Sequence, residues 1–396
     1  MSSVLNFLIQ YKSIFIFYLA VVIFLIIKRK QLEFQAKVII LYRMKFGLRF
    51  IEKCAQKFRE WIIVIGYVGV GVGYLGLIFI SFILVKSLYD LITTPAAASG
   101  VSLVLPGINV PGLGVLPFWY WVIAIFLIAL VHEFAHGIVA RAHNINVKNT
   151  GMVLLGPIIG AFVEPNEKKM SKEKDIVQYS VFAAGPFANI ILAVVALVLL
   201  NFLFVPLQHG MTEPTGFTFD DYAGEMLPFE QAGIVPGTLI TGIDKHQVDG
   251  FEKFSDRLYC KAAGEEIEIN TAENDYPVVL ADSPDKPGKG YMGIQNIHNE
   301  YEIKEEYSEG IWSSAYYALD WINGFLRWLF LLSLGIGLFN LLPLPIVDGG
   351  RMLQITLHKV RGTNKGERSF RKISLFFLLV LLLSLFYPFL SRIFGV

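Results

Sequence analysis

The stretch LIALVHEFAHGIVARAHN, residues 127–144, has the hydrophobicity of a membrane helix but carries ionisable side chains. Two histidines and a glutamate, His132, Glu133 and His136, interrupt the apolar run. A carboxylate at the centre of a bilayer costs roughly 2.5–3.5 kcal/mol by insertion scales, so such residues indicate a functional site by default. The rest of the chain must explain why these side chains lie there.

The spacing of the two histidines is suited to metal binding. His132 and His136 are four residues apart, so a helix projects both imidazoles from one face, where they can hold one metal ion. Glu133 lies beside them and can take a proton from a water molecule at the site. On a soluble helix the same pattern is often only a solvated polar face. Inside a membrane span that face would lie in hydrocarbon, which favours a zinc site.

The composition predicts a polytopic membrane protein. Of the 396 residues, 54% are hydrophobic and only 17% are charged, whereas soluble proteins carry roughly a quarter charged residues. A helix needs about 20 residues to cross the ~30 Å hydrocarbon layer. We expect six spans, at residues 4–27, 61–89, 117–141, 176–206, 313–341 and 372–393. The net charge of +1 gives no indication of a nucleic-acid partner.

The distribution of charge predicts the orientation of these spans. Lysine and arginine gather at 28–59, 141–174 and 351–372, whereas the loop 90–117 has neither. The positive-inside rule places the basic loops in the cytoplasm and both chain ends outside. The segment 207–310 holds 21 acidic and 7 basic residues and is expected outside as well.

The chain divides into four expected regions. Residues 1–60 form an N-terminal span with a basic cytoplasmic segment, and 61–206 form a membrane core with the histidine helix. Residues 207–310 contain short strand-like runs and turn signals, which predict a small, mostly β domain with one short helix near 252–260. Residues 311–396 complete the membrane core.

The segment 146–165 is apolar, but it is too short and too rich in glycine and proline to span the membrane. Non-helical backbone at membrane depth persists only where it is buried in protein or lines an aqueous cavity. We therefore expect a re-entrant β-hairpin beside the histidine helix, with an ordinary cytoplasmic loop as the alternative.

A hydrolytic zinc site needs a third protein ligand and one open position. Asp348 follows two helix-breaking prolines and precedes two glycines, which places a carboxylate on irregular backbone at membrane depth. His132 lies ~21 Å from the outer edge of its span at 1.5 Å per residue, near the cytoplasmic side, as does Asp348. Asp348 is the expected third ligand, and Glu164 is a weaker candidate.

Three motifs together resemble those of a known family. HEFAH at 132–136, GPFAN at 185–189 and NLLPLPIVDGG at 340–350 are similar to the signatures of site-2 proteases, the zinc intramembrane metalloproteases of peptidase family M50. The stretch AGIVPGTLITGIDKHQVDGFEKFSDRL at 232–258 resembles a PDZ core. The resemblance runs from about residue 115 onward. It implies a helical membrane bundle with a re-entrant hairpin and an inserted extracytoplasmic α+β PDZ-like domain.

The resemblance also implies residue roles. His132, His136 and Asp348 would hold one Zn²⁺ per chain, with Glu133 as general base. Two asparagines that match the family, Asn189 and Asn340, would hold the substrate backbone or polarise the scissile carbonyl. The alternative for each asparagine is a hydrogen bond between membrane helices.

The expected function is hydrolysis of peptide bonds within the transmembrane helices of single-pass substrates, in a multi-pass protein of the cell membrane. The active site would lie nearer the cytoplasmic face. The PDZ-like domain would bind an exposed peptide C-terminus or exclude substrates by size. Two alternatives stay open, a zinc transporter and a catalytically inactive, PDZ-bearing adaptor. Transport needs a relay of polar sites across the bilayer, whereas this chain has one cluster near one face.

Overall fold

The computed structural model describes residues 11–394, apart from 36–38, 46, 95–103, 108, 111–113 and 156–157. Two compact units make up the fold. One contains residues 1–200 and 324–396, and the other contains residues 201–323.

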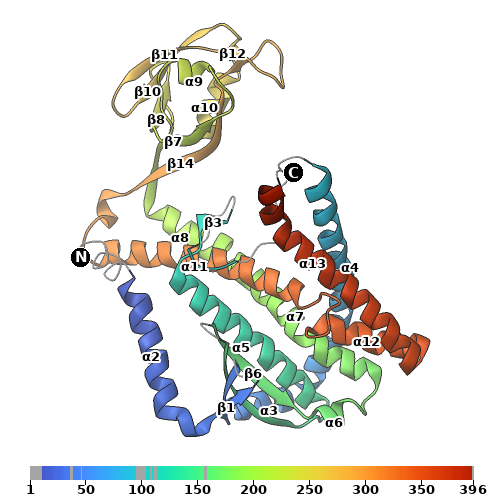
Figure 1. Cartoon of the computed structure of the whole chain (residues 1–396). Coiled ribbons are helices and arrows are strands. Elements are labelled where there is room, and N and C mark those ends of the chain that lie inside the picture. Colours follow the sequence, from blue (N-terminus) through green and yellow to red (C-terminus); the bar gives the residue numbers. More distant parts are fainter. Residues whose placement is uncertain are drawn as a thin grey trace. The chain divides into compact units, whose positions relative to one another are not determined.

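The first unit is built mainly from long apolar helices (Figure 1). Among the described residues, five helical segments are long and apolar enough to cross a membrane, so the chain is a polytopic membrane protein. The expected first span, 4–27, lies partly outside the described residues, and its described part is α2 (Lys12–Lys28). The other expected spans correspond to α4 (Arg59–Thr93), α5 (Phe118–Ala142), α7 (Asp175–Leu199), α11 (Gly310–Phe339) and α13 (Thr363–Phe394).

Small residues allow these helices to pack closely. α5 packs against α7, and α4 packs against both α7 and α13. A Cβ atom added at Gly73 of α4 would lie 3.3 Å from the Cβ of Ala183 on α7. At Gly76 it would lie only 2.5 Å from Leu341. These glycines belong to a GxGxxG pattern, and here they serve helix packing, as is common within membranes.

A four-stranded antiparallel sheet lies beside α5 (Figure 1). Its strand order is β1 (Leu32–Gln35), β2 (Ile39–Met44), β5 (Val147–Leu155) and β6 (Ile158–Pro165). β5 and β6 form the hairpin expected within 146–165. The re-entrant position of this hairpin in the bilayer remains a prediction. The basic segment before residue 60 was not expected to contain strands, yet it supplies β1, β2 and the amphipathic helix α3 (Leu48–Lys57). β6 is an end strand of the sheet and packs on α5.

A sharp turn joins α11 to α12 (Asp348–Arg361). The chain turns so tightly that a Cβ atom at Gly349 would lie 2.2 Å from the Leu341 carbonyl oxygen. At Gly350 it would lie 1.7 Å from the Leu344 carbonyl oxygen. We expected Asp348 on irregular backbone, but it is the first residue of α12. The irregular backbone ends just before it, because the two glycines allow a helix to begin immediately after the turn.

The second unit is rich in β-structure. Its main sheet has the order β11 (Asp275–Val279), β10 (Glu266–Thr271), β8 (Ile240–Ile243), β7 (Thr212–Tyr222) and β14 (Ile294–Ile303), with β9 (His246–Gln247) paired to β8. α10 (Phe251–Leu258) covers a core that contains four fully buried phenylalanines, Phe217, Phe219, Phe229 and Phe254. The PDZ interpretation of this α+β unit remains a prediction.

Candidate metal centre

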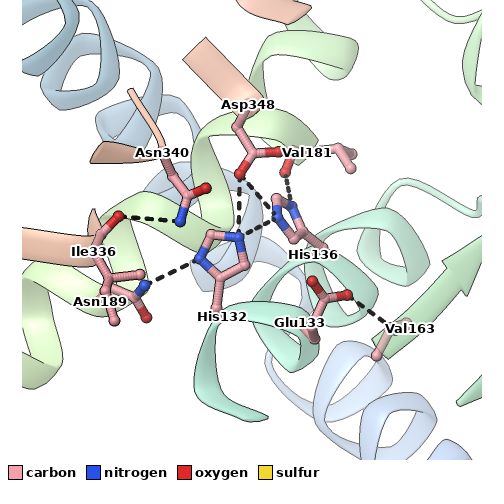
Figure 2. Close-up of polar contacts among 9 residues, drawn as sticks. All are labelled: His132, Glu133, His136, Val163, Val181, Asn189, Ile336, Asn340 and Asp348. Carbon is pink, nitrogen blue, oxygen red and sulfur yellow. Dashed lines mark hydrogen bonds and ion pairs between the residues drawn. The ribbon is translucent and has the colours of Figure 1, made fainter. Parts of the chain in front are cut away.

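Three candidate ligands from two distant parts of the chain converge in the first unit (Figure 2). One carboxylate oxygen of Asp348, Oδ2, lies 3.1 Å from Nε2 of His132 and 3.4 Å from Nε2 of His136. The two Nε2 atoms lie 3.1 Å apart. All three ligand atoms fall within 4.8 Å of one another, which makes this a possible His-His-Asp metal site.

The chemistry and shape of this cluster fit a zinc ion. Two imidazole nitrogens and one carboxylate oxygen are typical zinc ligands, and three protein ligands leave a fourth position open. The space beside them exists because α7 carries a glycine where it crosses α5. A Cβ atom at Gly185 would lie 2.4 Å from Nε2 of His136 and 2.5 Å from Nε2 of His132.

The backbone of α7 orients one of the two imidazoles. Nδ1 of His136 lies 2.6 Å from the carbonyl oxygen of Val181. A carbonyl oxygen can only accept, so Nδ1 carries the hydrogen, and Nε2, which faces Asp348, is the nitrogen left to bind a metal. Ligating histidines commonly have such a partner on their other nitrogen.

Asn189 orients the second imidazole. It is fully buried, and its side-chain amide lies 3.1 Å from Nδ1 of His132. Its Oδ1 has no hydrogen-bond partner among the described residues. The two ends of an amide are assigned from the hydrogen-bond network. Turning this amide over lets Oδ1 accept from Nδ1–H of His132, which gives Oδ1 a partner and leaves Nε2 of His132 free for a metal.

The remaining predicted residues occupy different positions. Glu133 projects from α5 toward β6, where its Oε2 accepts a hydrogen bond of 3.0 Å from the backbone N–H of Val163 (Figure 2). Asn340 donates through Nδ2 to the carbonyl oxygen of Ile336 at 3.0 Å, one turn earlier on α11. The backbone carbonyl oxygen of Asn340 accepts a hydrogen bond of 2.8 Å from the N–H of Gly349, the residue after Asp348.

Glu164, the weaker candidate for third ligand, points elsewhere. It forms an ion pair with Arg43 of β2 and accepts a hydrogen bond from Nδ2 of Asn149 at 3.1 Å. These contacts hold the pKa of its carboxyl below the usual value, with the bond from Asn149 as the largest cause. Asp348, rather than Glu164, is the carboxylate beside the two histidines.

A cavity of about 600 Å³ has Asp348 in its wall, so it borders the candidate metal centre on one side. Much of the wall is polar, and its side chains come from α6 (Glu167–Met170), α7 and α12. They include Lys168, Gln178, Arg351 and His358.

Sequence comparison with known proteins points to the same chemistry as the His-His-Asp cluster. A model of peptidase family M50 matches residues 120–385. The chain belongs to peptidase family M50. It is similar to an uncharacterized protein of Methanocaldococcus jannaschii, with 27% identity over 318 residues, which cover 78% of this chain and 74% of the relative.

Two named relatives indicate the chemistry of the family. The zinc metalloprotease RasP of Shouchella clausii is 25% identical over 218 residues, which cover 45% of this chain and 50% of RasP. The protease RseP of Yersinia pestis is 36% identical over 104 residues, which cover 25% of this chain and 22% of RseP. The chain thus aligns with about half the length of RasP and with a smaller part of RseP. These matches support a membrane-embedded zinc metalloprotease.

Proposed function

We propose that this M50 protein is a zinc-dependent intramembrane protease that hydrolyses peptide bonds within the transmembrane helices of other membrane proteins. The observation that carries the proposal is the convergence of Asp348 with His132 and His136 on a helix apolar enough to span a bilayer. The Asp348 carboxylate, 212 residues further along the chain than His136, lies beside both imidazoles. Glu133 lies on the adjacent face of the same helix, α5.

The two histidines and Asp348 would hold the metal. A zinc ion bound there supplies Lewis acidity, which polarises a carbonyl and makes a nearby water easier to deprotonate. Glu133 takes the proton from that water as general base and returns it to the leaving nitrogen as general acid. Asn189 and Asn340 flank the ligands and would bind the substrate backbone around the scissile bond.

The substrate must be unwound before it can be cut, because a helix hides its carbonyl groups in internal hydrogen bonds. β6 is an end strand next to Glu133 and is suited to hold the unwound segment by β-augmentation, in which a peptide adds a strand to a sheet edge. The cavity at Asp348 would bring water, from the cytoplasmic side under the positive-inside assignment.

The acidic second unit would act as a gate on the outer side of the membrane. Under this proposal it excludes membrane proteins with large folded ectodomains, or it binds a C-terminus exposed by an earlier cut. Deleting residues 207–310 separates the two roles. A size filter predicts that substrates with large ectodomains become cleavable, and continued resistance of those substrates would refute the filter.

The proposed function is tested by cleavage of a model transmembrane peptide in proteoliposomes, with the product masses fixing the cut site. Glu133→Gln keeps the size and the polarity of the side chain but cannot act as a base. We expect the variant to keep its zinc and to lose at least 100-fold in rate, since general acid–base catalysis contributes about 10²–10⁴-fold. Cleavage by this variant at the wild-type rate would refute the assigned base.

A further inference from the structure

The hydrogen bond between Glu133 and Val163 connects the expected general base to the strand next to it (Figure 2). The donor is a peptide N–H of β6, and the acceptor is Oε2 of Glu133, at 3.0 Å. A carboxylate has two oxygens with about four acceptor sites. A bond to Oε2 therefore fixes the carboxylate and leaves Oε1 for another partner.

The pairing of β6 shows which of its backbone groups face outward. In an antiparallel ladder, the residues of one strand alternate between pointing their N–H and C=O toward the partner strand and away from it. Val163 lies opposite Thr150 of β5, but its N–H goes to Glu133. Ala161, two residues earlier, has the same orientation by this alternation. By this alternation the outer edge of β6 presents the backbone groups of Ile159, Ala161 and Val163.

Close packing makes this arrangement rigid. The Val163 side chain is 8% exposed, and its Cγ1 would lie 2.9 Å from a Cβ atom at Gly137 of α5. Nearer the other end of β6, a Cβ atom at Gly160 would lie 3.7 Å from the Cβ of Ala129, also on α5. Glycines thus bring the strand close to the helix on both sides of Glu133, so the N–H of Val163 meets the carboxylate at a fixed place.

We propose that the backbone N–H of Val163 is the positioning group for Glu133, on the same strand that the proposed β-augmentation would use. This inference rests on the proposed protease function. Val163 acts on the reaction through Glu133. Its N–H is already occupied, so under the proposed β-augmentation the pairing with substrate would involve the next outward-facing N–H and C=O, those of Ala161. One strand would then hold both the base and the substrate, which fixes the distance between them.

Proline substitutions test this inference because they remove a single N–H. Proline is tolerated on an edge strand where the lost N–H points away from the sheet. We expect Val163→Pro to lower kcat for the model transmembrane peptide by about 10- to 100-fold, because a bond to a charged group is lost. Ala161→Pro should instead raise KM by about 2- to 10-fold, because a neutral main-chain bond to substrate is lost.

Two further variants separate the N–H from other effects. Val163→Ala keeps the N–H, so the effect of the N–H is the difference between the proline and alanine variants. Incorporating the α-hydroxy analogue of valine at position 163 replaces the N–H by an ester oxygen and keeps the side chain. The α-hydroxy analogue of alanine at position 161 is its matched control, since it weakens the strand chemically in the same way.

The two ester variants are decisive if a proline changes the fold, and zinc content is measured in each. The inference predicts one zinc per chain in both variants, a fall in kcat at position 163 and a rise in KM at position 161. Equal changes in kcat at the two positions, or no change at position 163, would overturn it. A wild-type protein that does not cleave the peptide would overturn the proposed function instead.

Discussion

Gly185→Ala is expected to destroy the metal site while leaving the rest of the membrane unit folded. The added Cβ atom would lie 2.4 Å from Nε2 of His136 and 2.5 Å from Nε2 of His132, whereas an ordinary contact of this kind is 3.4–4 Å. The imidazoles or α7 must therefore move by about 1 Å, whereas ligand distances in a working metal site hold to within about 0.2 Å.

This shift is large compared with changes known to weaken metal sites. Loss of a single outer hydrogen-bond partner typically costs about 10–100-fold in metal affinity or activity. We expect Gly185→Ala to lower zinc affinity by at least about 100-fold, because both histidines are displaced at once. α7 itself should not weaken, because alanine is a better helix former than glycine by about 1 kcal/mol.

The assay is zinc content by elemental analysis after dialysis against a graded series of zinc buffers, together with peptide cleavage. Gly71→Ala is the matched control, since it makes the same change in α4 with nothing within 4 Å of the new Cβ atom. It should keep both zinc and cleavage. A Gly185→Ala protein with zinc affinity and cleavage equal to the control would refute the assignment of this cluster as the zinc site.

Three further predictions concern individual carboxylates. Asp348→Ala leaves two histidines, so zinc affinity in the same dialysis series should fall at least 10-fold; unchanged affinity would exclude Asp348 as a ligand. Glu164→Gln removes a partly buried ion pair with Arg43, so it should cost about 1 kcal/mol or less and leave zinc content unchanged; lost zinc would restore Glu164 as a ligand candidate. Hydrogen bonds from Lys261 and from the backbone N–H of Ala262 hold the pKa of the Glu265 carboxyl below its usual 4.5. The stabilisation of the folded state by the ionised carboxylate is therefore fully present above pH 4.5 and is lost as the pH falls below that value. Glu265→Gln should therefore flatten the acid dependence of hydrogen exchange in the second unit of the full protein, and an unchanged acid dependence would contradict this cause.

The geometry of much of the candidate site could be predicted from the sequence, because its residues are fixed by helix spacing or by their depth in the membrane spans. The spacing of His132 and His136 requires only a helix to place both imidazoles on one face. Asp348 could be chosen because few carboxylates lie at membrane depth, and the helix-breaking prolines and glycines marked its segment. The turn before α12 explains why that carboxylate can reach α5.

Contacts made by the backbone could not be predicted. Val163 acts on Glu133 through a peptide N–H, which every residue except proline carries, and Val181 acts on His136 through a carbonyl oxygen, which every residue carries. No side-chain pattern distinguishes them. The pairing of β2 with β5 was missed for a related reason. Short strands that pair with a partner about 110 residues away leave little local signal, and basic residues around β2 suggested a simple cytoplasmic segment.

Zinc K-edge X-ray absorption on the purified protein, compared with Asp348→Ala, tests the central claim most directly. The account predicts a wild-type spectrum with imidazole and oxygen scatterers, no sulfur, and one carboxylate lost in the variant. A sulfur ligand, or an identical zinc environment in the two proteins, would contradict a site in which this aspartate joins the two histidines.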